Sequence, residues 1–246
     1  MRFFLLLTIF LFGSVLPLAA QTENDSAGGF FKRGTQLAQR GDYGAAFDFY
    51  RKALEISENS GRSSAQFQAK VHYNLGVCLF QKGEKTKSVA EFSRAVEFDK
   101  NYAAAFYALG LAQSELENYA AAKTAFLRVL EITGECHGEA WFDLAFVYLA
   151  EKDFDRAAAS FAQAVRFGSR DAPMAHNNLG VIFALKHDFI AAEKEFKTAW
   201  KASRERLILA KNNLGFIRQY QQNKNQALLA EIVFGTKNQT SEETKN

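Results

Sequence analysis

The amino-acid sequence predicts an all-α solenoid built from about six stacked helix-turn-helix units. Three observations support this fold class. Apolar residues make up 48% of the 246 residues, with 24 Phe and only 2 Pro. Val and Ile runs with the period of two that marks strands are missing. One short segment also recurs along the chain at nearly constant spacing. The chain can therefore bury a helical core and does not belong to the disordered class.

The first twenty residues are expected to form a secretory signal peptide. Arg2 is followed by an uncharged apolar run that ends in small residues at Ala20, and this order is typical of such signals. The alternative is an uncleaved membrane anchor, because the run is just long enough to span a bilayer. Gly13, Ser14 and Pro17 favour cleavage, which we expect after Ala20. The mature chain is then expected to be periplasmic or secreted, without stable membrane insertion.

The recurring segment supplies the first helix of each unit. Five copies align without gaps on a shared Gly or Ala, and the successive spacings are 34, 35, 35 and 35 residues. Such a period is the signature of a repeat architecture. The shared positions are Gly76, Gly110, Ala145, Gly180 and Gly215.

A second pattern supplies the other helix of each unit. Twelve residues after the shared position comes a small residue, at Ser88, Ala122, Ala157, Ala192 and Ala227. Four residues further on, four units have a phenylalanine, at Phe92, Phe126, Phe161 and Phe196. A short apolar side chain follows after three more, at Ala95, Val129, Ala164 and Ala199. Steps of four and three keep these residues on one helix face. Each unit is therefore predicted to be two antiparallel helices, and the Gly or Ala of the first lets the second approach closely.

This pattern resembles the tetratricopeptide repeat. The third unit carries it most fully, with Leu109-Gly110, Tyr119, Ala122 and Phe126. The resemblance implies a right-handed α-solenoid over residues 28–235. Its units are expected near residues 28–60, 69–101, 103–136, 138–170, 173–205 and 208–235.

Two units depart from the regular pattern. The first lies 42 residues before the second, measured from Gly34 to Gly76, and a polar loop at residues 59–64 is expected to hold the extra residues. The sixth has Glu231 where Phe is expected, which fits a capped end with nothing stacked beyond it. The tail at residues 236–246 is polar and expected to be disordered.

Charge argues against a nucleic-acid binder, and two Cys are too few to frame a small disulfide-bonded domain. Without Arg2 the chain carries 29 basic and 27 acidic side chains, whereas a nucleic-acid binder should carry a concentrated basic face. Cys78 and Cys136 are the only thiols. We expect them to be separate, with Cys78 packed in a helix and Cys136 in a loop.

The motifs of common catalytic sites are missing from the sequence. There is no Gly-rich phosphate loop, no HExxH, no paired CxxC and no nucleophile elbow. His72 and His176 occupy a helix-packing position, and His137 stands in a short loop cluster whose spacing matches no known metal site. We therefore predict a protein that is not an enzyme and that needs no cofactor or metal.

The resemblance also implies a binding surface, because first helices line the inner groove of this family. The basic residues with which some members clamp a C-terminal carboxylate are missing. The lining is instead apolar with interleaved asparagines, which can pair both backbone groups of an extended peptide. The alternative is that these side chains pack against neighbouring helices or fill the groove. The predicted lining residues are Phe31, Tyr73, Asn74, Val77, Phe80, Tyr107, Leu111, Phe142, Phe146, Leu149, Asn177, Asn178, Val181, Leu185, Asn212, Asn213, Phe216 and Tyr220.

Three functions are compatible with such a groove. The first is an exported scaffold that binds an apolar peptide or amphipathic helix of another protein, in an envelope or secretion assembly. The second is a binder of a small apolar ligand or lipid, as in a transporter accessory protein. The third is a homo-oligomer in which the C-terminal helix of one chain lies in the groove of another.

Overall fold

The computed structural model describes residues 26–61 and 64–236 of the chain. Over these residues it contains α-helices and no strand, which confirms the predicted all-α class. The predicted signal peptide lies outside the described residues, as does the predicted tail beyond Thr236. The helices are α2 (Ala27–Gln39), α3 (Tyr43–Ser60), α4 (Ala65–Gln81), α5 (Lys85–Phe98), α6 (Ala103–Glu115), α7 (Tyr119–Thr133), α8 (Gly138–Ala150), α9 (Phe154–Arg166), α10 (Ala172–Leu185), α11 (Phe189–Ala202), α12 (Ile208–Asn223) and α13 (Ala227–Ala230).

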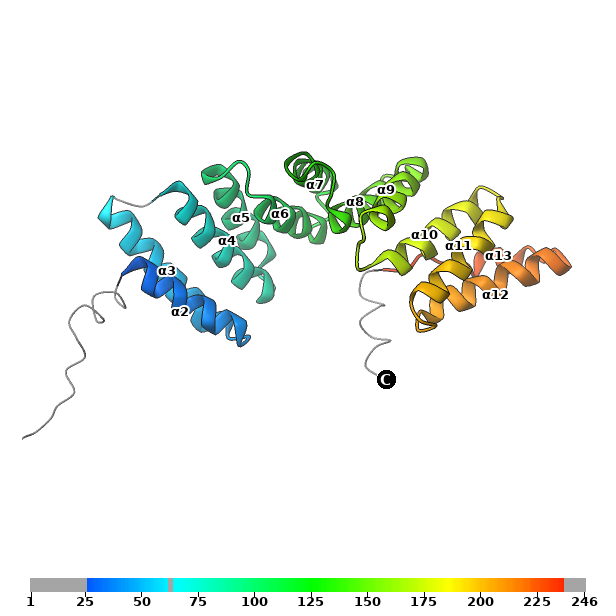
Figure 1. Ribbon diagram of the computed structural model, residues 1–246, viewed down its shortest axis with the longest axis horizontal. Helices are drawn as coiled ribbons and strands as arrows, with labels where there is room; N and C mark the ends of the chain where they lie inside the picture. The colour runs from blue at the N-terminus through cyan, green and yellow to red at the C-terminus, as the bar shows by residue number, and fades with distance from the viewer. Residues whose placement is uncertain (1–25, 62–63, 237–246) are drawn as a thin grey trace, which may run out of the picture.

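Consecutive helices pack as pairs, and each pair packs on the next. The pairs are α2 with α3, α4 with α5, α6 with α7, α8 with α9 and α10 with α11, and the second helix of each pair contacts the first helix of the following one. Figure 1 shows these pairs strung along the long axis of the molecule in an arched array. First helices also contact one another, α4 with α6, α6 with α8 and α10 with α12. They therefore share one face of the array, which we call the inner face.

The glycines of the first helices allow the two helices of a unit to pack closely. In three units, a Cβ added to the glycine would lie only 2.6 Å from the ring of the phenylalanine 16 residues later. The second helix can approach this closely because glycine has no Cβ. These pairs are Gly76 with Phe92, Gly110 with Phe126 and Gly180 with Phe196. The predicted reason for the repeated glycine is therefore confirmed.

The second helices begin at short aspartate-capped turns in three units. Asp42, Asp153 and Asp188 each accept a hydrogen bond from the backbone N–H three residues later. These bonds satisfy backbone donors that a helix start leaves unpaired. The sequence predicted these turns from their polar residues, and the structure shows that in three of them an aspartate caps the helix that follows.

The extra residues of the first unit form less loop than predicted. Helix α3 continues to Ser60, and Gly61 ends it with a left-handed backbone (φ 60°). Ser64 then caps α4, its hydroxyl accepting from the N–H of Phe67. Part of the insertion predicted at residues 59–64 is therefore the helix end at Ser60 and the helix cap at Ser64.

The sixth unit differs from the predicted helix pair at residues 208–235. Helix α12 forms as expected, but its partner is only the single turn α13, and residues 231–236 are not helical. A Cβ at Gly215 would meet nothing within 4 Å, unlike the glycines of the other units. Since Glu231 replaces the phenylalanine that would cover Gly215, no ring holds a second helix against α12.

Candidate functional site

The inner face of α4, α6 and α8 is hollowed by two adjoining cavities. One has a volume of about 340 Å³ and is walled by Tyr73, Val77 and Tyr107. The other, of about 390 Å³, is walled by Phe146, by the polar residues Ser114, Glu115 and Asp143, and by Thr236 near the C-terminal end of the described chain. Phe80 and Leu111 line both cavities, so the two form one apolar surface. We call this surface the open groove and define it by Tyr73, Val77, Phe80, Tyr107, Leu111 and Phe146, all of them predicted lining residues.

A hydrogen-bonded pair fixes the polar side of the open groove. The hydroxyl of Tyr107 donates to Asp143 Oδ2 over 2.6 Å. Burial raises the pKa of Tyr107 well above its usual range, and the negative charge of Asp143 raises it further. Tyr107 therefore stays a neutral donor. His137, whose ring lies 5.0 Å from that of Tyr107, accepts from the N–H of Ala140 through Nδ1. These contacts hold the aromatic wall in one orientation.

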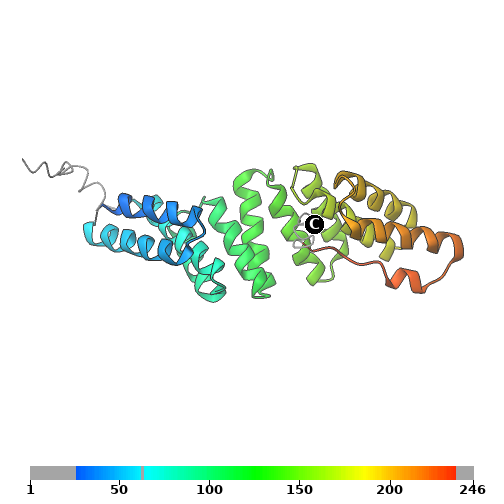
Figure 2. The same cartoon turned by 90° about the horizontal axis from the view of Figure 1, so that it is seen from below.

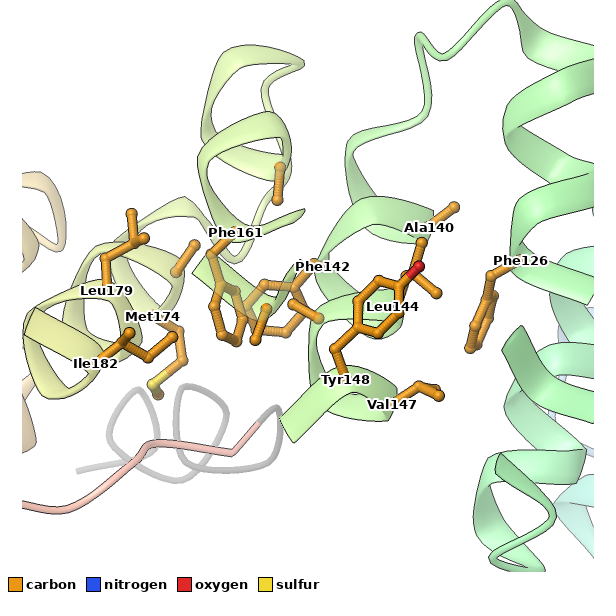
Figure 3. Close-up of a cluster of buried hydrophobic side chains, with 14 of the residues drawn as sticks. Phe126, Ala140, Phe142, Leu144, Val147, Tyr148, Phe161, Met174, Leu179 and Ile182 are labelled. Carbon is orange, nitrogen blue, oxygen red and sulfur yellow. The ribbon is translucent and has the colours of Figure 1, made fainter. Parts of the chain in front are cut away.

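The inner face of α10 and α12 is covered by the chain itself. After α13 the backbone runs back across these helices, and Figure 2 shows this segment crossing the array from below. We call residues Ile232–Thr236 the strap. Figure 3 shows the same segment passing beside Met174 at the edge of a buried apolar cluster.

Two asparagines hold the backbone of the strap. Asn213 accepts from the N–H of Val233 (3.2 Å) and donates to its carbonyl (2.9 Å). Asn178 does the same with Gly235, at 2.8 Å and 3.0 Å. Residues two apart in the strap are thus paired on the same side, which is the period of an extended chain.

A third asparagine connects the first two. Asn177 accepts from Asn213 Nδ2 over 2.9 Å and donates to Asn178 Oδ1 over 3.1 Å. All three side chains are 0% exposed. Buried amides are costly unless paired, and the backbone of the strap supplies the partners that these amides need where it covers them.

Side chains of the strap also contact the helices. Phe234 packs against two buried apolar clusters, one that includes Phe161 and Met174 and a C-terminal cluster that includes Val181 and Phe196. Ile232 packs against the C-terminal cluster. Gly235 is buried, and a Cβ there would lie 1.9 Å from Met174 Sδ and 2.9 Å from Leu209 Cδ2. Met174 is itself 0% exposed and has little room to move. The residues packed around position 235 therefore leave room for glycine and not for a residue with a side chain.

Several predicted lining residues lie elsewhere. Phe142 is 0% exposed, because its ring packs edge-on against Phe146 and Phe161, so it belongs to the core and not to the groove wall (Figure 3). Tyr220 is buried against Phe189.

The remaining predicted residues are placed as follows. Phe31 contacts the rings of Tyr50 and Phe67, and Asn74 donates to the Lys70 carbonyl of its own helix. Leu149 packs on the core and Phe216 is half-buried. The last three are Val181 and Leu185, which line a small cavity beside Ile232, and Asn212, which is exposed.

Sequence reasoning missed the strap. It assigned residues 208–235 to a helix pair and so expected no backbone for Asn178 and Asn213 to hold within the chain. Two signals pointed the other way. Ile232 and Val233 are β-branched residues that favour an extended chain, and Glu231 removes the ring that would have fixed a helix.

Other reactive groups are accounted for by packing. His72 and His176 contact Glu91 and Glu195 at 2.7 Å and 2.6 Å, each across its own helix pair. Both thiols are free, with Cys78 buried and Cys136 exposed. Within residues 26–61 and 64–236, no group of three or more His, Cys, Asp and Glu side chains could hold a metal ion. Over the same residues, no helix has the length and apolarity needed to cross a membrane.

Comparison with family models and known proteins identifies the repeat. Models described as "Tetratricopeptide repeat" match residues 30–60, 107–172 and 142–204, and one described as "TPR repeat" matches residues 78–117. A search of curated proteins found no match.

Solved structures with the same fold include three that cover most of this chain. A crystal structure of MamA is 20% identical and covers 74% of this chain and 94% of its own, with a TM-score of 0.64. PilF of Pseudomonas aeruginosa is 19% identical, with coverages of 86% and 90% and a TM-score of 0.64. YrrB, described as a TPR protein with an unusual peptide-binding site, is 23% identical, with coverages of 74% and 89% and a TM-score of 0.61. At these identities the likeness shows a shared fold.

Proposed function

This chain belongs to the tetratricopeptide repeat family, and we propose that it is a non-catalytic protein–protein interaction scaffold whose inner groove binds an extended apolar peptide. One observation carries the proposal. The inner face already holds one extended segment, the strap on α10 and α12, through paired backbone bonds to Asn178 and Asn213. A peptide-binding site reported for the similarly folded YrrB is compatible with it.

The asparagine contacts favour an extended peptide over an amphipathic helix. Each asparagine pairs with both the N–H and the C=O of one residue. In a helix these backbone groups already bond to each other, so only an extended chain offers them. We therefore expect the partner to bind as an extended segment.

The open groove supplies apolar contacts for such a segment. Phe80 and Leu111 line both cavities, and Phe146 lines the one of about 390 Å³. The charge of Glu115 beside them is paired with Lys85 over 2.6 Å, so the surface does not select a basic ligand through that residue. Apolar side chains of the peptide would fill these cavities.

Selection of a displayed library of random peptides on the full chain tests the proposal. The variant Phe80→Glu places a charge in both cavities, and Ile190→Glu is its control, because Ile190 is 82% exposed on α11. We expect apolar peptides to be enriched on the wild type and on Ile190→Glu, and to be lost on Phe80→Glu. Equal enrichment on Phe80→Glu with unchanged helical content, or no apolar peptide on the wild type, would refute it.

A small apolar ligand or lipid is the second candidate function. The two adjoining cavities, of about 340 and 390 Å³, have the size of ligand sites. Native mass spectrometry of gently purified protein decides between the two. A co-purifying small molecule that Phe80→Glu removes would favour the ligand, and its absence would favour the peptide.

We propose further that the mature scaffold is exported and acts in an envelope or secretion assembly. This rests on the basic start and apolar run of the first twenty residues. N-terminal sequencing of the protein from fractionated cells is expected to give a chain that starts at Gln21. A chain that keeps Arg2 and sediments with membranes would indicate an anchor.

A further inference from the structure

We propose that the strap is a tethered ligand, and that the groove between α10 and α12 recognises an extended peptide of the pattern apolar-x-Phe-Gly in another protein. Such a partner binds by displacing Ile232–Thr236. This inference rests on the proposed peptide-binding function and adds to it the chemistry of the partner.

The backbone contacts show what the partner must replace. Asn178 and Asn213 use both the oxygen and the nitrogen of their amides on the strap, and Asn177 couples them. All three are 0% exposed. Because a buried amide without a partner is unfavourable, a chain that covers these asparagines in place of the strap must offer them the same two pairs of backbone groups. This part of the groove alternates between the strap and a second extended chain.

The side-chain contacts show which sequence fits. Phe234 packs against the two apolar clusters on either side of it, so we expect the partner to place a large apolar side chain there, with Phe as the one that the strap itself uses. The next residue has no space for a side chain, since a Cβ at Gly235 would lie 1.9 Å from Met174 Sδ. Val233 is 47% exposed, so its position is free to vary. Ile232 packs on the C-terminal cluster, which gives the pattern apolar-x-Phe-Gly.

The connection to the strap suits release. Lys224 ends α12 in a left-handed conformation (φ 57°), and residues 222–227 are exposed. Only the single turn α13 separates this hinge from the strap. Segments with few buried contacts open at low free energy, so this hinge lets the strap leave while the helix pairs stay folded. Leaving breaks the four backbone bonds to Asn178 and Asn213, which the partner then replaces. A short tether nevertheless gives the strap a local concentration on the order of millimolar, against which a partner competes.

A labelled peptide with the strap sequence tests the inference on the full chain. The probe is fluorescent Ala-Glu-Ile-Val-Phe-Gly-Thr-Lys, measured by anisotropy against wild type and two variants that dislodge the strap. Gly235→Val collides with Met174, and Phe234→Asp removes the aromatic anchor while leaving the glycine. We expect both variants to bind the probe at least about tenfold more tightly than the wild type does, because the tethered competitor is gone.

Two controls give the test its specificity. A probe with Val in place of Gly should not bind, and adding Asn213→Ala to either variant should abolish binding. Equal affinity of the wild type and both variants for the probe would overturn the inference, as would no binding to variants that keep the wild-type helical content. Light scattering that shows a wild-type dimer lost in Gly235→Val would also overturn it, by assigning the site to a second copy of the chain.

Failure here is distinguishable from failure of the proposed function. The strap reaches the open groove only through Thr236, which shares a cavity with Phe80. The strap variants change Phe234 and Gly235, and Gly235 lies against Met174 of α10 and Leu209 of α12. Suppose that apolar peptides bind the wild type and not Phe80→Glu, while the strap probe binds none of the variants. The scaffold function would then stand, and only the proposal that the strap is a tethered ligand would be rejected.

Discussion

Two glycines at the same repeat position should respond to alanine in opposite directions. Gly110 in α6 faces Phe126, and an added Cβ would lie 2.6 Å from the ring, whereas Gly215 in α12 has nothing within 4 Å. Both lie inside helices. Ala is better than Gly in a helix interior by about 1 kcal/mol, so this gain is common to both substitutions. Only Gly110→Ala also forces an overpacked contact.

The structure therefore sets the size of the difference. Overpacking a closely packed core costs roughly 1–3 kcal/mol. Subtracting the helix gain leaves Gly110→Ala destabilised by up to about 2 kcal/mol, while Gly215→Ala is stabilised by about 1 kcal/mol. Since the propensity term cancels between the two variants, their difference of roughly 1–3 kcal/mol measures the contact with Phe126.

Urea unfolding followed by circular dichroism measures both variants against the wild type. The free energy of unfolding is compared from midpoints at constant slope, because a changed slope would mean a changed unfolding transition. Shifts of the same sign, or a difference below about 0.5 kcal/mol, would refute the claim that the ring makes the glycine necessary.

Two further predictions concern the strap and the buried thiol. Asn213→Ala leaves both backbone groups of Val233 without their side-chain partner, so amide exchange over residues 232–236 should accelerate by about 10- to 100-fold, the equivalent of losing roughly 1–3 kcal/mol. The exposed neighbour Asn212 is the matched control, and unchanged exchange in Asn213→Ala would contradict the assigned bonds. Burial raises the pKa of the Cys78 thiol from 9.0 to about 11. The unfolded chain therefore loses this proton first, and stability should fall between pH 9 and pH 11. Cys78→Ala should reduce that fall in alkaline denaturation curves, and an identical pH dependence would show that the thiol is not its cause.

Contacts set by local spacing were predictable from the sequence. The meeting of Gly110 with Phe126 depends on 16 residues and one turn, and the same spacing recurs in other units. A periodic pattern reports such contacts because each unit repeats the same geometry. This is why the helix pairs followed from spacing, and why the resemblance to the tetratricopeptide repeat could place Phe80, Leu111 and Phe146 along the inner face.

Contacts between distant segments were not predictable in this way. The bonds between Asn178 and Gly235 join residues 57 positions apart, and no period connects them. The burial of Phe142 was also missed, because repeat register places it on the inner face while ring packing against Phe146 and Phe161 draws it into the core. Register gives the direction of a side chain along a helix, whereas neighbouring side chains decide whether it stays accessible.

One substitution in the repeat accounts for both the end of the helical pattern and the strap. Glu231 stands where a phenylalanine would cover Gly215, and without that ring the second helix shortens to α13. The residues that would have completed the helix then have free backbone groups, which Asn178 and Asn213 pair on the inner face. Glu231→Phe should therefore favour a longer helix beside α12 and draw residues 232–236 out of the groove. If helicity rises in this variant while the affinity for the strap peptide stays at the wild-type level, the coupling between helix loss and groove occupancy is wrong.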